Sequence, residues 1–456
     1  MANKSKAALQ RVSKKNIGDY FYLWAIPFLA FAIKIIVMAN ISNGGWLGAD
    51  GESYLVGVDG LLEQGYFSDE SILFYWSAGY PILIWLLTKL SVVNAIWILS
   101  FVQSAFYAYA SYFFVKQLRD TKLRPYIFLI GAVLAFNPTL SLSSLAVGYE
   151  SSIAACMLMI VGLIFKSKQS LEANKIGIYI VGVGCFSALA SFMQPRWVLI
   201  SIVVANAWAL MYKNRKVQAA ILVGVIGIMA IAPAVLAQRN LHSTGQAVVS
   251  TTLGITMQLG AGDNATGGYS NTSTSVPCSP IPPATSATDS DLVKCVIKWY
   301  VGHPVKAVHL FINKGFFFWS PWSGSLANGT MARNPWLKIN PLSSIAKSSQ
   351  QGNDLVNKLL GKIVSFAWVM GCISMMFIGF FWLRSMRGLY ASIAYITLTP
   401  IVISWLVAMG TVGDHRYRIP TMPLSLFLQA MGYFALRHKA KTRSFAIALE
   451  PSAKSR

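Results

Sequence analysis

The chain has 456 residues, of which 55% are hydrophobic and only 12% charged, and its mean hydropathy is +0.53. This composition excludes a string of ordinary soluble domains and indicates a protein with many membrane helices. A formal net charge of +22 raises nucleic acid as a partner. The Lys and Arg residues, however, gather in short segments between apolar runs, which is the pattern of cytoplasmic loops. We therefore expect this charge to face membrane lipids, and we expect no nucleic acid partner.

Apolar runs long enough to cross a bilayer as helices, about 20 residues each, recur along the chain. We expect about ten spans, at 20–40, 93–116, 125–142, 147–165, 176–193, 197–212, 217–237, 361–383, 389–409 and 420–437. The apolar stretch 79–91 is too short to cross alone and predicts a half-buried or interfacial helix. The pattern thus predicts an all-α polytopic membrane protein.

The basic residues also predict which side each loop occupies. Lys and Arg are concentrated in the N-terminal tail, the C-terminal tail and the loops near 116–124, 166–168 and 213–216. With ten spans these segments share one side, so the positive-inside rule places both termini in the cytoplasm. Three regions follow: a membrane region at 1–237 that includes a first outer loop at 41–78, a large outer loop at 238–358 between spans seven and eight, and a membrane region with a basic tail at 359–456.

Both outer segments contain helical patterns. In the first, apolar residues at helical spacing predict a short helix on the membrane surface: Tyr54, Val58, Leu61 and Leu62. In the second, a helix should begin at Pro304 and lie in the interface plane, anchored by Trp319 and Trp322, with an apolar face of Val305, Val308, Ile312 and Phe316.

Two cysteines, Cys278 and Cys295, share the large outer loop. A disulfide between them would suit an oxidising compartment, whereas a metal role lacks further ligands.

Charged residues on the outer side form an unusual set. The motif GADGESY holds Asp50 and Glu52 in a region without any Lys or Arg between positions 34 and 89. Conversely, the short outer loop TVGDHRYRIPTMP contains Arg416 and Arg418, although such loops tend to exclude arginine. A salt bridge with Asp414 or contact with lipid headgroups would explain the arginines. The alternative is a phosphate site, because the forked guanidinium donors match phosphate oxygens; Lys314 and Arg239 would add to it.

The order of these motifs resembles a known family. The segments GADGESYL, LLEQGYF and AGYPILIWLL are followed by FNPTLSLSSLAVGYES, QPRW, PAVLAQRNLHSTGQ, GDNATGGY, FINKGFFFW and HRYRIPTMP. This series is similar to that of the GT-C fold membrane glycosyltransferases that use polyprenyl-phosphate sugars, such as protein mannosyltransferases (glycosyltransferase family 39) and lipid A aminoarabinose transferases. The chain departs from the family at its first motif, where a glycine separates two acids that are adjacent in many relatives. It also has Gln194 before Pro195 and Arg196, where arginine then proline is commoner, so we do not count Arg196 as a ligand.

The resemblance implies an enzyme that transfers a sugar from a polyprenyl-phosphate donor to a hydroxyl or amine of a lipid, glycan or protein acceptor. Such a displacement needs a base for the acceptor proton and positive charge for the departing phosphate. We expect Asp50 as the base unless it only caps the following helix, with Glu52 as the rival base or an acceptor contact. Glu150 either shapes the sugar or acceptor site or pairs with an arginine.

The remaining site residues are expected to bind substrates. Arg416 and Arg418 are assigned to the lipid phosphate, with Lys314 and Arg239 as additional cations. Tyr54 either packs or donates to the substrate, and Asn264 either hydrogen-bonds donor or acceptor or only makes a turn.

The wider setting follows from the same pattern. No cofactor is required by this chemistry and no metal ligand is assigned, although a divalent metal at the acidic motif is left open. We expect a bacterial inner membrane with the active site on the periplasmic face. A transporter or flippase of a lipid-linked sugar is the alternative function; such proteins place charges near the bilayer midplane on interrupted helices.

Overall fold

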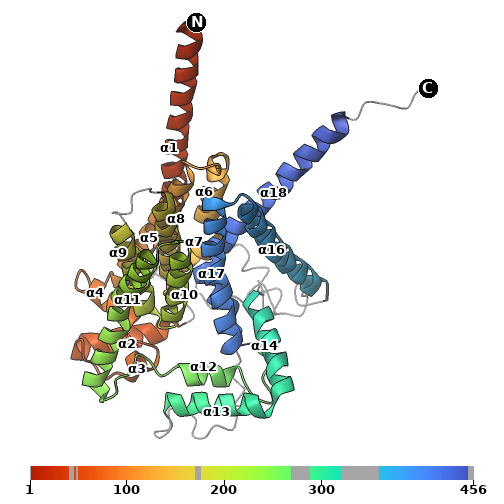
Figure 1. Ribbon diagram of the computed structural model, residues 1–456. Coiled ribbons are helices and arrows are strands. Elements are labelled where there is room, and N and C mark those ends of the chain that lie inside the picture. The colour runs from red at the N-terminus through yellow and green to blue at the C-terminus, as the bar shows by residue number, and fades with distance from the viewer. Residues whose placement is uncertain are drawn as a thin grey trace.

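The computed structural model describes residues 2–40, 46–47, 50–169, 176–268, 288–319 and 359–449. These ranges form an all-α polytopic membrane protein (Figure 1). They also contain two very short strands. In chain order the elements are α1 (Ala2–Ala39), β1 (Trp46–Leu47), α2 (Gly51–Gln64), α3 (Ser71–Tyr75), α4 (Gly79–Thr88), α5 (Ala95–Leu118), η1 (Arg124–Tyr126), α6 (Ile127–Phe136), α7 (Pro138–Ser143), β2 (Ala146–Val147), α8 (Glu150–Gln169), α9 (Ile176–Met193), α10 (Trp197–Leu210), α11 (Arg215–Thr244), α12 (Leu253–Leu259), α13 (Asp289–Gly302), α14 (Pro304–Trp319), α16 (Leu359–Ser385), α17 (Gly388–Gly410), η4 (His415–Thr421) and α18 (Met422–Leu449).

Seven helical segments in the described part of the chain are long and apolar enough to cross a membrane. They lie at Phe21–Ala39, Ala95–Leu118, Glu150–Gln169, Ile176–Met193, Arg215–Thr244, Gly388–Gly410 and Arg416–His438. Three further predicted spans coincide with shorter apolar helices, Arg124–Phe136, Trp197–Leu210 and Val369–Ser385. The stretch that we judged too short to cross is the ten-residue helix α4.

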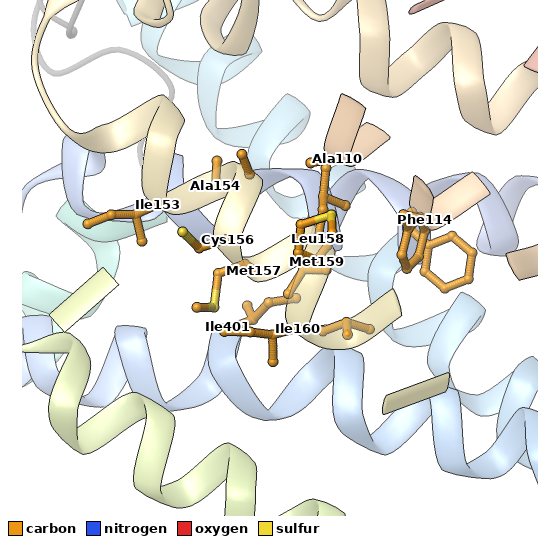
Figure 2. Close-up of a cluster of buried hydrophobic side chains, with 14 of the residues drawn as sticks. Ala110, Phe114, Ile153, Ala154, Cys156, Met157, Leu158, Met159, Ile160 and Ile401 are labelled. Carbon is orange, nitrogen blue, oxygen red and sulfur yellow. The ribbon is translucent and has the colours of Figure 1, made fainter. Parts of the chain in front are cut away.

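Helix α8 is the centre of the bundle. In the apolar stretch of α8 that would cross the membrane, 89% of the residues are buried inside the protein. In every other span of the described residues this share is 67% or less. Within the bundle, α8 carries apolar or small residues on all of its own faces, which is the pattern of a helix with no solvent face. Figure 2 shows this core, where Ile153, Met157 and Ile160 of α8 lie among side chains that include Phe114 of α5 and Ile401 of α17.

Two glycines allow α16 and α18 to pack in direct backbone contact. A Cβ on Gly379 would lie 1.9 Å from the Leu428 carbonyl oxygen, and one on Gly432 would lie 2.1 Å from that of Met375. Small residues permit this close approach between membrane helices.

The helices of the two predicted outer segments lie at the end of the bundle opposite both chain termini (Figure 1). There α2 buries Tyr54, Val58 and Leu61, as its spacing predicts, although Leu62 is exposed. The predicted apolar face of α14 points away from the protein, with Val305 84% and Val308 61% exposed. Trp319, which we expected to anchor α14 in the interface, is instead buried in the protein; Trp322 lies outside the described residues.

Candidate active site at the end of the bundle opposite the termini

The two short strands place two acidic residues at equivalent positions. β1 and β2 pair in parallel, with Trp46 opposite Ala146 and Leu47 opposite Val147. Asp50 follows the first strand by the same number of residues as Glu150 follows the second. Each acid stands where a helix begins, since α2 starts at Gly51 and α8 at Glu150. The positive end of a helix dipole favours a carboxylate at such a position.

The local backbone directs both carboxylates into one site. Asp50 occupies the N-cap position of α2, yet its side chain makes no capping hydrogen bond. Glu150 folds back over Gly148, where a Cβ would lie 2.5 Å from the Glu150 Oε2 atom. Capping therefore does not explain Asp50, and Gly148 leaves the room that the Glu150 side chain takes.

Arg416 joins the two acids. Its Nη2 atom donates to Asp50 Oδ2 at 2.6 Å, and its Nε atom lies 3.2 Å from Glu150 Oε1. The turn that carries it is held by Asp414, whose Oδ1 accepts from the Arg416 backbone N–H at 2.8 Å. The three side chains are only 11–18% exposed. Arg416 thus has the salt bridge that we considered as an alternative, but with Asp50 and Glu150 rather than with Asp414 alone.

A group of tyrosines packs beside the acids. The rings of Tyr54 and Tyr80 are 5.0 Å apart, and each lies 6.2 Å from the ring of Tyr149. Burial raises the pKa of Tyr54 well above its usual value, and the neighbouring acids Asp50 and Glu150 add to this effect. Tyr54 is therefore a neutral hydroxyl beside the carboxylates, able to donate a hydrogen bond.

Sequence reasoning missed a polar cluster on the other side of Tyr149. The Tyr149 hydroxyl accepts from Gln194 Nε2 at 2.9 Å and from an Arg196 N–H at 3.1 Å. Arg196 also lies over the ring of Tyr417, with its guanidinium carbon 4.1 Å from the ring centre. The QPRW turn was the available signal, but its departure from the family pattern led us to discount Arg196.

Lys314 is a buried cation on α14. Only 1% exposed, it donates to the Tyr300 hydroxyl at 2.7 Å. Burial lowers the pKa of Lys314 to about 8 and raises that of Tyr300 to about 12. The backbone of Lys314 lies against the loop that leads to Arg416, because a Cβ on Gly413 would be only 2.6 Å from the Lys314 carbonyl oxygen.

Arg418 extends the basic region from η4 to the end of α14. Its Nη1 atom donates to the Trp319 carbonyl oxygen at 2.7 Å, and the guanidinium carbon lies 5.6 Å from the Trp319 ring centre. Among the described residues, no carboxylate pairs with Arg418 or Lys314. Both cations keep donors that an anionic ligand could use.

Other residues expected in the site lie elsewhere. The Arg239 guanidinium donates to the carbonyl oxygens of Tyr66 and Ser68, so it holds the loop after α2. Glu52 is exposed on the first turn of α2, and Asn264 is exposed beside the ion pair of Asp263 with Lys306.

The predicted disulfide is only partly within the described structure. Cys295 on α13 is disulfide-bonded. Cys278 lies outside the described residues, so the pairing of these two cysteines stays a prediction.

Comparison with known proteins gives one finding on structure. No family model matches the sequence, and no curated protein matches it. Among solved structures, the chain is similar to the archaeal oligosaccharyltransferase AglB from Archaeoglobus fulgidus in complex with an inhibitory peptide and a dolichol-phosphate, with 12% sequence identity and a TM-score of 0.49. The match covers 96% of this chain and 52% of that one, so this chain spans about half the length of the structure it matches. At this TM-score the likeness carries no argument about activity, which must be judged on the site.

Proposed function

We propose that this protein is an integral-membrane glycosyltransferase of the GT-C type, which moves a sugar from a polyprenyl-phosphate donor to an acceptor hydroxyl or amine. The observation that carries the proposal is the buried Asp50–Arg416–Glu150 cluster at the outer end of the bundle. Ionised groups are costly to bury, and clusters of them in a membrane protein mark functional sites.

In the proposed reaction, the acceptor oxygen or nitrogen forms a bond to the anomeric carbon while the bond from that carbon to the phosphate oxygen breaks. The acceptor proton passes to Asp50, and the polyprenyl phosphate leaves with the bonding electron pair. Such a single displacement inverts the anomeric configuration. Asp50 is supported over Glu52 as the base, because Asp50 lies in the cluster whereas Glu52 is exposed. Glu150 positions Arg416, and the neutral Tyr54 hydroxyl hydrogen-bonds the substrate.

The leaving phosphate needs positive charge more than it needs a proton. Arg418 and Lys314 supply it in the proposal, because each is a cation without a carboxylate partner in the described structure. Arg416 is already paired with both acids, so its part is to hold them and to contribute positive charge nearby. We leave Arg239 out of the phosphate site, because its donors are used by backbone oxygens of another loop.

The position of the charges also bears on the rival function. A flippase or transporter tends to carry ionisable groups near the bilayer midplane on interrupted helices. Here Glu150 is the first residue of α8 and Arg416 belongs to the turn before α18, so both stand at the ends of spans. This supports an enzyme acting at the extracytoplasmic surface, which in a bacterium would be the periplasmic face of the inner membrane.

Replacement of the proposed base tests this function. Purified Asp50→Asn protein in nanodiscs should lose transfer from a panel of radiolabelled polyprenyl-phosphate monosaccharides by about 100-fold or more, because a base of this kind contributes on that scale. Binding of labelled polyprenyl phosphate should remain measurable. Glu52→Gln is the matched control on the same helix turn and should transfer at the wild-type rate.

Three results would contradict the proposal in different ways. Full transfer by Asp50→Asn would remove Asp50 as the base, and loss of transfer only in Glu52→Gln would give that role to Glu52. If the wild-type protein moved the labelled lipid-linked sugar across liposomes without transferring it, the flippase would replace the enzyme.

A further inference from the structure

The guanidinium of Arg416 contacts the same two carboxylates that a bridging divalent cation would need. One of its nitrogens is 2.6 Å from Asp50 Oδ2 and another is 3.2 Å from Glu150 Oε1. A Mg²⁺ or Mn²⁺ ion held by the same two oxygens would have to lie about 2.0–2.2 Å from each of them. Such an ion would have to share these oxygens with the arginine nitrogens that already contact them.

The side chains around Asp50 and Glu150 do not suit a divalent metal ion while Arg416 remains in place. Within the described ranges, no group of three or more His, Cys, Asp or Glu side chains is arranged to hold a metal ion. A bound divalent cation would also stand beside the positive guanidinium in a largely buried site, where repulsion between like charges is strong. The donor set therefore suits one resident cation, and Arg416 is that cation.

Arg416 is built into this position rather than lying over it loosely. It is 9% exposed, and it belongs to η4, whose first turn is held by the Asp414 side chain. Its guanidinium pairs with two acids, and each of these acids stands at the start of a helix. Moving the guanidinium away would leave two nearby carboxylates without a counter-charge, which is costly in a buried site.

We infer that Arg416 takes the place of a divalent metal in this active site, so that sugar transfer needs no divalent cation. This inference rests on the proposed function for its catalytic meaning, but the exclusion of the metal is a property of the binding site itself. The Asp50 carboxylate stays in the cluster beside the guanidinium and is the group that receives the acceptor proton in the proposed reaction. The guanidinium holds both acids in one cluster, as a metal would otherwise do.

Metal binding tests the inference without reference to catalysis. Purified wild-type protein in nanodiscs is titrated with Mn²⁺. Electron paramagnetic resonance distinguishes the free from the bound ions. We expect no Mn²⁺ binding that depends on Asp50. Arg416→Ala should create an Asp50-dependent Mn²⁺ site, with an affinity about tenfold or more above any residual Mn²⁺ binding by the wild type. The double variant Asp50→Asn/Arg416→Ala should lose the gain. Arg418→Ala, two residues away and without a carboxylate neighbour, is the matched control and should not gain binding.

Each outcome decides for or against the inference. Mn²⁺ binding by the wild type that disappears in Asp50→Asn would overturn it, as would a folded Arg416→Ala protein that gains no Mn²⁺ binding. Arg416→Gln serves as a second variant if Arg416→Ala does not give a monodisperse protein; if neither folds, the wild-type titration decides. Wild-type transfer that persists in EDTA would support the inference, and transfer that requires added Mn²⁺ would refute it. A wild type that transfers no sugar under either condition contradicts the proposed function, whereas the Mn²⁺ result still decides the metal question.

Discussion

The buried lysine on α14 gives the most quantitative prediction. Lys314 is 1% exposed and burial lowers its pKa to about 8, whereas an exposed lysine titrates near pH 10.5. This difference corresponds to roughly 3 kcal/mol of disfavoured charge, which an anionic ligand can offset by pairing with the ammonium. If Lys314 contacts the lipid phosphate, then only its protonated form binds well.

The pH dependence of binding follows directly. The phosphate monoester loses its second proton near pH 6 and keeps one charge state from pH 7 upward. Lysine deprotonation then controls affinity, so the Kd for polyprenyl phosphate should rise about tenfold per pH unit above pH 8 and be about 30-fold higher at pH 9.5 than at pH 7. The assay is equilibrium binding of labelled polyprenyl phosphate to protein in nanodiscs across this pH range.

Two variants make the reasoning specific to this residue. Lys314→Met should bind weakly and show no such rise, because it has no titrating group. Tyr300→Phe removes the hydroxyl that accepts from the Lys314 ammonium at 2.7 Å. The pKa of Lys314 should then fall further, and the midpoint of the binding curve should move to lower pH. A flat wild-type curve between pH 7 and 9.5, or an unchanged rise in Lys314→Met, would show that Lys314 does not bind the phosphate.

Two further predictions separate structural residues from the site. Gly379→Ala should destabilise the protein by about 1–3 kcal/mol, because its Cβ would meet the Leu428 carbonyl of α18. Thermal unfolding in detergent measures this, with Gly371→Ala as the control, since nothing lies within 4 Å of a Cβ at Gly371. Equal stability of the two variants would contradict the close packing of α16 and α18. Arg239→Met should lower stability by about 1–3 kcal/mol through the lost bonds to the loop at Tyr66 and Ser68, with polyprenyl phosphate affinity unchanged. A stable Arg239→Met protein with weakened lipid binding would return Arg239 to the phosphate site.

Local sequence pattern predicted much of the secondary structure. Seven of the ten predicted spans, and the short helix α4, were readable because a bilayer requires helices of a certain apolar length, whatever their neighbours. The buried side of α2 was predicted for a related reason, since residues at helical spacing share a face. Trp319 shows the limit of this reasoning: aromatic residues near a membrane surface suit an interface anchor, but its ring instead packs beside Arg418 and Trp405.

The sequence by itself determined a polytopic helical chain, and it predicted acids and arginines in the outer segments. It could not say which of them meet. Asp50 and Arg416 are separated by 366 positions, and no periodicity relates residues so far apart; their contact depends on how β1 and β2 pair and on how η4 packs against α8. In the sequence, Arg239 and Arg416 looked alike as predicted outer arginines. Only the tertiary structure shows that Arg239 pairs with backbone carbonyls and Arg416 with two carboxylates. Helix formation depends on local hydrogen bonds and hydrophobicity, whereas the partner of a charge is chosen by the packing of distant elements.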